Sequence, residues 1–228
     1  MDIVNNTEST IVNSSEKQGG NKVVILLSKI LSVIFFPLFL PIYGMAMLLS
    51  ISFFSYYPEA FIVRAWFFVL CLGVVVPFTC ILLLRLLRVV SDMRLRDKRD
   101  RLFPYMMTGI SYVFCAIALY MLAFPVFVSE IVVGVALALI IDAVVSYFWK
   151  ISAHMTGVGS VLSGVLITCY CLNLFGFFCL SCCVIVCGLV AMARLYLYKH
   201  TPAQVLAGFF NGFVCPILVS FVAPYFIY

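Results

Sequence analysis

Three short polar segments hold the residues of this chain that could do chemistry. One is Ser152-Ala153-His154, and another is Arg194-x5-His200-x3-Gln204; their histidines are the only two in the 228 residues. The third segment, residues 94–101, contains five cations and two anions. Guanidinium groups can bind phosphate through paired hydrogen bonds, so one interpretation of these arginines is phosphate capture. The alternative for residues 94–101 is a solvated loop beside a membrane.

Membrane helices must position these segments. The chain is 65% hydrophobic and only 10% charged, which does not fit a soluble domain with a polar surface. A bilayer core roughly 30 Å thick requires about 20 apolar residues per helix, so the chain can supply six or seven crossings. Its apolar runs are continuous and do not alternate, which argues against strands. The sequence therefore predicts an all-α polytopic membrane bundle of six to seven transmembrane helices.

The apolar runs also give the expected boundaries. We expect residues 1–21 to form a disordered polar tail and residues 22–228 to form one transmembrane domain. Pro37 and Pro41 interrupt the first apolar stretch and Pro77 the second, so we expect kinks, or a re-entrant opening in the first stretch. The expected spans are 23–52, 62–87, 104–124, 127–149, 157–174, 177–197 and 203–226.

Seven crossings would bring the three polar segments to the same side of the membrane. The loops concerned are residues 88–103, 150–156 and 198–202. All 14 lysines and arginines except Arg64 lie on that side or at its helix ends, and the positive-inside rule makes this side cytoplasmic. Arginines gathered to bind phosphate would bias the same count, so the charge pattern has two interpretations.

The order and spacing of the three segments resemble a known family. The chain contains Arg94-x6-Arg101, then Ser152-Ala153-His154, then Ala193-Arg194-x5-His200-x3-Gln204. It resembles the type 2 phosphatidic acid phosphatase superfamily of membrane lipid phosphatases, whose motifs are Lys-x6-Arg-Pro, Pro-Ser-Gly-His and Ser-Arg-x5-His-x3-Asp. The third motif is the specific part of the match, and the resemblance covers about residues 94–210.

The resemblance implies a role for each matching residue. His200 would be the nucleophile that forms a phosphohistidine, and His154 would protonate the leaving oxygen and later activate water. Fixed cations and donors would stabilise the negative charge that spreads over the phosphoryl oxygens. The phosphate-binding residues would be Arg194, Arg101, Arg94, Lys98, Ser152 and Ala153.

The chain departs from the family pattern at two positions of the third motif. Ala193 lacks the hydroxyl of the family's serine, and Gln204 replaces the Asp that orients the nucleophilic histidine. An amide four residues from His200 shares its helical face, and the amide oxygen can accept a hydrogen bond from the ring N–H of His200. It cannot stabilise a positive imidazole as a carboxylate does. In a serine protease that change costs about 10⁴ in rate, whereas papain-like enzymes work with Asn. The sequence leaves open an active phosphatase or a weakened or inactive lipid-phosphate-binding relative.

A transporter is a third alternative, because carboxylates inside apolar helices are costly and usually functional. Asp142 and Glu130 are the residues in question. Asp142 could instead pair with a buried cation or with a polar group of another helix. Phosphate release that depends on His200 would favour hydrolysis, and ion-dependent uptake would favour transport.

The remaining features predict packing more readily than chemistry. Four cysteines of one span, at positions 179, 182, 183 and 187, have no histidine nearby, so we interpret them as packing residues and expect neither a metal nor another cofactor. Gly157, Gly159 and Gly164 favour close helix packing, although a glycine wall beside His154 could also admit a headgroup or a lipid tail.

The expected partner is a membrane lipid substrate, with no nucleic acid involved. Candidates are phosphatidic acid, phosphatidylglycerol phosphate or a polyprenyl diphosphate, and the sequence does not separate them. We expect the chain to be embedded in a bacterial inner (plasma) membrane, with the active face cytoplasmic. The sequence gives no indication of the oligomeric state.

Overall fold

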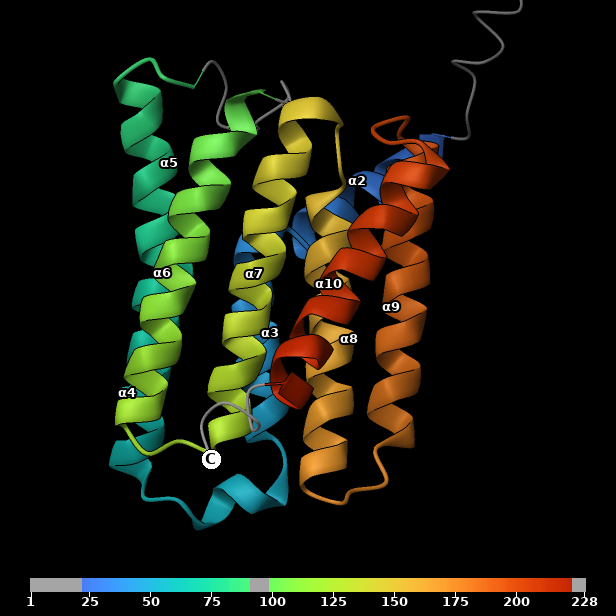
Figure 1. Ribbon diagram of the computed structural model, residues 1–228. Helices are drawn as coiled ribbons and strands as arrows, with labels where there is room; N and C mark the ends of the chain where they lie inside the picture. Colours follow the sequence, from blue (N-terminus) through green and yellow to red (C-terminus); the bar gives the residue numbers. More distant parts are fainter. Residues whose placement is uncertain (1–21, 91–98, 223–228) are drawn as a thin grey trace, which may run out of the picture.

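The described residues, 22–90 and 99–222, form an all-α bundle with no strand among them in the computed structural model (Figure 1). Six of its helices are long and apolar enough to cross a membrane, with Glu59–Leu86 counted as one. The predicted all-α polytopic fold is confirmed. The tail, Arg94 and Lys98 lie outside the described residues. The helices are α2 (Lys22–Ile34), α3 (Leu40–Leu49), α4 (Glu59–Leu70), α5 (Val76–Leu86), α6 (Leu102–Met121), α7 (Val126–Phe148), α8 (Ala153–Cys171), α9 (Phe177–Tyr196) and α10 (Pro202–Val222).

The first apolar stretch is broken, as its prolines predict. Helices α2 and α3 meet at a bend of 41° across a short 3₁₀ turn, Pro37–Phe39. Phe36 is extended, with φ −65° and ψ 134°, because a residue before proline is driven out of the helical region. If the bent pair counts as one crossing, the total is seven. The break leaves α2 beside α9 and lets α3 continue among the other helices.

Pro77 produces a local widening of the helix. A π-helical turn, Cys71–Val75, joins α4 to α5 just before it. Proline has no N–H to donate to residue 73, so that carbonyl needs another partner. Tyr112 of α6 supplies it through its hydroxyl, 3.4 Å from the Gly73 oxygen, and Ser111 donates to the Leu72 oxygen at 2.6 Å. The irregular helix is thereby tied to α6.

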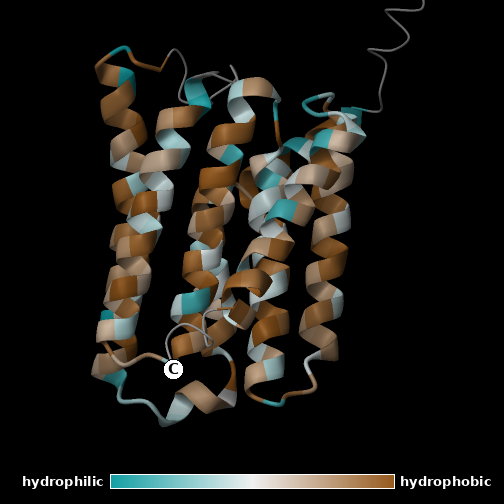
Figure 2. Cartoon of the chain, viewed as in Figure 1, coloured by the Kyte–Doolittle hydropathy of each residue, from teal (hydrophilic) through white to brown (hydrophobic). Residues whose placement is uncertain are grey.

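The described ends of the three polar segments lie at one end of the bundle. Helices α5, α7 and α9 end there, and α6, α8 and α10 begin there (Figure 1). One boundary was predicted wrongly: α8 begins at Ala153 and not at residue 157, because Ser152 takes the extended geometry of a helix N-cap (φ −95°, ψ 97°). His154 therefore lies in the first turn of a helix. Most residues along the helices are hydrophobic (Figure 2), and many of their large apolar side chains are exposed.

Close contact between α8 and α10 fixes the site geometry. Gly208 and Gly212 of α10 face the backbone oxygens of Ser152 and Thr156, and Gly159 of α8 faces that of Phe209. A Cβ at any of these glycines would collide with backbone, so larger residues would force the helices apart. The packing interpretation of Gly159 agrees with this contact. The contact between α8 and α10 holds the start of α10, which includes Gln204, beside the start of α8.

Candidate active site

Arg101 joins the first polar segment to the second. It immediately precedes α6 and is buried, with 7% of its surface exposed. Its Nη1 donates to the backbone oxygen of Ile151 at 3.0 Å. A guanidinium is rarely buried unless its charge has polar partners, so this bond fixes Arg101 against the turn that leads to Ser152 and His154.

His200 lies in the short connection between α9 and α10, with 9% of its surface exposed. Its Nδ1 is 3.2 Å from Oε1 of Gln204 and 3.3 Å from the backbone oxygen of Lys150. The Thr201 N–H also donates to Oε1, at 3.2 Å, which identifies that atom as the amide oxygen. Both partners of Nδ1 can only accept, so Nδ1 carries the proton. The lone pair of the neutral ring is therefore on Nε2.

Several effects together lower the pKa of His200 from 6.5 to about 4. Burial is the largest, followed by the positive charges of Arg194 and Arg101; the hydrogen bond to Gln204 raises the pKa, and the charge of Lys150 lowers it. The imidazole is therefore neutral at pH 7, the form that a nitrogen nucleophile requires. Its interactions with the two arginines also place His200 in a positive environment.

This shift predicts a pH dependence of stability. Below pH 6.5 the unfolded chain binds a proton at His200 that the folded protein does not bind until about pH 4. The free energy of unfolding should therefore fall as the pH drops through this interval, and His200 should add no further loss below it. Melting temperatures in detergent, measured across this range for the wild type and His200→Gln, should show a smaller decline in the variant. Identical declines would contradict the shift.

His154 is held by a residue that the sequence did not suggest. Its Nε2 lies 3.0 Å from the backbone oxygen of Ser32 in α2. Because a carbonyl only accepts, Nε2 carries a proton and donates it. The ring of Phe36 meets the imidazole edge-to-face with centroids 5.8 Å apart. His154 also interacts electrostatically with Arg194, His200 and Arg101, so the two histidines and these arginines lie in one region of the structure.

Two buried polar atoms at the site have no hydrogen-bond partner among the described residues: Oγ of Ser152 and Nε of Arg194. A serine at an N-cap usually bonds to the first turn of its helix, but Ser152 does not. A different nitrogen of the Arg194 guanidinium, Nη1, donates to Oγ of Ser32 at 3.4 Å. Leaving such buried groups unsatisfied costs free energy, so they indicate a place for an absent ligand or water.

Ser32 was missed by the sequence reasoning. It is a small polar residue within an apolar helix, one turn after the buried Ser28. Two serines four residues apart on one face of an apolar helix were the available signal. Ala193, by contrast, is buried at 2% exposure, so the hydroxyl near Arg194 comes from α2 and not from position 193.

Asp142, one basis of the transporter alternative, is fully buried, and its Oδ2 has no hydrogen-bond partner among the described residues. Its Oδ1 accepts from the Asn211 amide at 2.8 Å, and the same amide nitrogen donates to the Ala138 oxygen at 2.9 Å. Asp142 therefore joins α7 to α10 through a helix polar group, one of the two partners expected from the sequence. The four clustered cysteines of α9 point in different directions, since Cys183 and Cys187 are buried while Cys179 and Cys182 are exposed.

No family model, curated protein or solved structure matches this chain.

Proposed function

We propose that this chain is an integral membrane phosphohydrolase that cleaves a lipid phosphate through a phosphohistidine. The observation that carries the proposal is the pair of unpartnered buried donors, Ser152 Oγ and Arg194 Nε, beside two histidines of defined tautomer. A phosphate would supply oxygens to both donors and a charge to the surrounding arginines. The start of α8 adds backbone N–H groups and the positive end of its dipole.

The two histidines fit the two proton and bonding requirements of the reaction. With phosphate bound, whose negative charge favours a protonated ring, His154 would be an imidazolium that carries a proton on both nitrogens. Nε2 of His200 would attack phosphorus while the bond to the leaving oxygen breaks, and that oxygen would take the Nε2 proton of this imidazolium, which leaves His154 neutral. In the second step, neutral His154 would take a proton from water as the water oxygen attacks phosphorus. The P–N bond then breaks, and both imidazoles return to their starting forms. Arg194 and Arg101 would offset the charge on the phosphoryl oxygens throughout.

Substrate has to compete with α2 for two of these groups. The Ser32 carbonyl accepts a hydrogen bond from Nε2–H of His154, and the Ser32 hydroxyl accepts one from Arg194. A leaving oxygen can receive that proton only after the carbonyl releases it. The break at Pro37 gives α2 a boundary about which it could shift without disturbing α3. Productive binding in this proposal therefore includes displacement of Ser32.

The site lies where the helices end, and in a bilayer crossed by these helices that end would lie at the depth of the lipid headgroups. An amphiphile could reach it by diffusing within the membrane plane. The proposed substrates are a lipid monophosphate or a polyprenyl diphosphate, and we propose a cytoplasmic orientation because lysine and arginine are concentrated at this end.

Arg194→Gln tests whether the unpartnered guanidinium binds phosphate. Purified wild-type protein in detergent should release inorganic phosphate from a long-chain alkyl phosphate. The variant should lose about 10- to 150-fold in kcat/KM, as expected for a hydrogen bond to a charged group. Arg85→Gln is the matched control, because Arg85 is exposed at the same end of the bundle in α5 and should leave the rate unchanged. Equal rates for all three proteins would contradict the assignment.

A second candidate is a lipid-phosphate-binding protein without hydrolysis. Gln204 favours this binding function, because its amide oxygen accepts a hydrogen bond from His200 but gives a positive imidazole no countercharge. The same measurements separate the two functions. Binding of a non-hydrolysable alkyl phosphonate that Arg194→Gln weakens, without phosphate release by the wild type, would identify a binding protein.

A further inference from the structure

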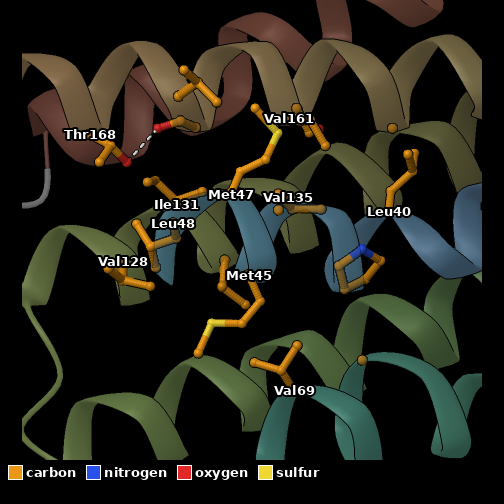
Figure 3. Close-up of a pocket in the computed structure, with 18 of the residues that line it drawn as sticks. Leu40, Met45, Met47, Leu48, Val69, Val128, Ile131, Val135, Val161 and Thr168 are labelled. Atoms are coloured by element: carbon orange, nitrogen blue, oxygen red, sulfur yellow. Dashed lines mark hydrogen bonds between the residues drawn. The ribbon is translucent and has the colours of Figure 1, made fainter. Parts of the chain in front are cut away.

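A cavity of about 420 Å³ lies within the bundle, outside the polar site. Figure 3 shows Met45, Met47 and Leu48 of α3 directed toward side chains of neighbouring helices. The facing walls come chiefly from α7 and α8, with contributions from α4 and α6. The volume lies within the range of about 300–1,000 Å³ that is usual for small-molecule sites.

The cavity follows α8 along its whole length. Its lining includes Ala153 and Thr156 in the first turn of that helix and Cys169 near its end, and continues to Phe175 beyond it. A helix of 19 residues is about 28 Å long, close to the thickness of a bilayer core. Ala153 stands between Ser152 and His154. One end of the cavity therefore adjoins the proposed phosphate site, and the other reaches the opposite end of the bundle.

The lining offers nothing that would bind a polar solute. No charged residue contributes to it. Each lining hydroxyl donates to a backbone oxygen: Ser50 to Met47, Tyr112 to Gly73, Thr156 to Ser152, Ser160 to Thr156 and Thr168 to Gly164, at 2.7 to 3.4 Å. Such a cavity favours hydrocarbon over an ion or water. Asp142 and Glu130, the basis of the transporter alternative, are not part of the wall.

We infer that this cavity binds one hydrocarbon chain of the amphiphile whose phosphate occupies the polar site. The inference rests on the proposed function for the headgroup, and it adds the part of the site that selects the tail. A chain entering past Ala153 would run between α3 and α8 and bury its methylenes, each contributing about 0.8 kcal/mol. Substrate preference should therefore depend on the length of a single chain.

Two glycines show where the width of the cavity is set. At Gly157 a Cβ would collide with Cδ1 of Leu40, so this glycine makes room for a side chain that narrows the passage near the site. At Gly44 of α3, a Cβ would meet no atom within 4 Å, although the residue lines the cavity. A larger residue at Gly44 would therefore project into space without forcing the helices apart.

Gly44→Leu tests the inference with a matched control. Gly188 of α9 is exposed, is not in the cavity wall, and also has no atom within 4 Å of a built Cβ, so Gly188→Leu adds the same side chain outside. Phosphate release would be measured with alkyl phosphates of eight and sixteen carbons. Gly44→Leu should lower kcat/KM for the long substrate by about tenfold, the loss expected when roughly two methylenes leave the cavity. It should leave the short substrate unchanged, and Gly188→Leu should change neither.

A loss shared equally by both substrates, or no loss for the long substrate, would overturn the inference. A second readout separates it from the proposed function: photocrosslinking of a sixteen-carbon alkyl phosphonate that carries a diazirine at mid-chain. Labelled peptides should map to α3 and α8, and labelling should fall about tenfold in Gly44→Leu but not in Gly188→Leu. This pattern without phosphate release would retain the chain site and reject hydrolysis. Labelling confined to the outer surface would reject the chain site whatever the catalytic result.

Discussion

Replacing His200 with alanine should abolish phosphate release from a lipid phosphate. The hydrogen bonds of its imidazole define the position of a free lone pair: Nδ1 is committed to Gln204 and Lys150, which leaves Nε2 to attack. Without it, no P–N bond forms and the reaction has to rely on direct attack by water. We expect a loss of about 10⁴-fold or more in kcat, comparable with removal of a nucleophile from other covalent enzymes.

His200→Gln provides a control for folding, since an amide can still donate to the Lys150 oxygen. Both variants should retain helical circular dichroism and bind an alkyl phosphonate within a few-fold of the wild type. The wild type quenched in alkali should also contain phosphate bound to protein at this position, because a phosphoramidate survives base. Activity that persists in His200→Ala at the wild-type rate would reject the nucleophile and, with it, the proposed mechanism.

Much of the fold could be predicted from hydropathy and proline positions. Continuous apolar runs determine where helices form, and Pro37 determines where the first run breaks, because both effects are local. The start of α8 was placed too late because the span was taken from hydropathy, and the first turn of the helix includes the polar residues His154 and Thr156. Gly157 and Gly159 follow this turn. Their small size is used for tertiary contact, with Leu40 and with the backbone of Phe209. Such contacts depend on which helices become neighbours, and the sequence alone does not specify this.

The polar site could be predicted in part. The motif spacing indicated His154, Arg194 and His200, and the structure brings them together with Arg101 and Ser152. The spacing of Ser28 and Ser32 could have drawn attention to Ser32, but its contacts with His154 and Arg194 could not be predicted, because they span more than a hundred residues and depend on how α2 turns at Pro37. The cavity was unpredictable for the same reason: its walls are formed by residues of several helices, and each helix alone looks like an ordinary apolar span.

Gln204→Asp should raise turnover by about 100-fold or more if the amide limits the nucleophile. Phosphorylation of His200 makes the ring positive, and a carboxylate at position 204 would stabilise that charge where the present amide oxygen, 3.2 Å from Nδ1, supplies only a dipole. In a serine protease the reverse exchange of Asp for Asn costs about 10⁴, which sets the upper bound. Burying a carboxylate costs free energy, but the cost is reduced at position 204 because the positive charges of Arg194 and Arg101 reach His200, the residue that Gln204 contacts.

The direction of this effect distinguishes two views of the site. The carboxylate should raise the pKa of His200 from about 4, since an opposite charge favours the protonated ring. Turnover of Gln204→Asp should therefore fall on the acid side at a higher pH than that of the wild type, while exceeding it at pH 7 and above. Gln204→Glu is the matched control, because glutamate has the charge of aspartate and the length of glutamine. If charge alone matters, its turnover should rise as well. A decrease in both variants would mean that the neutral amide serves another role than orienting a nucleophile, because a carboxylate oxygen could still accept from the Thr201 N–H.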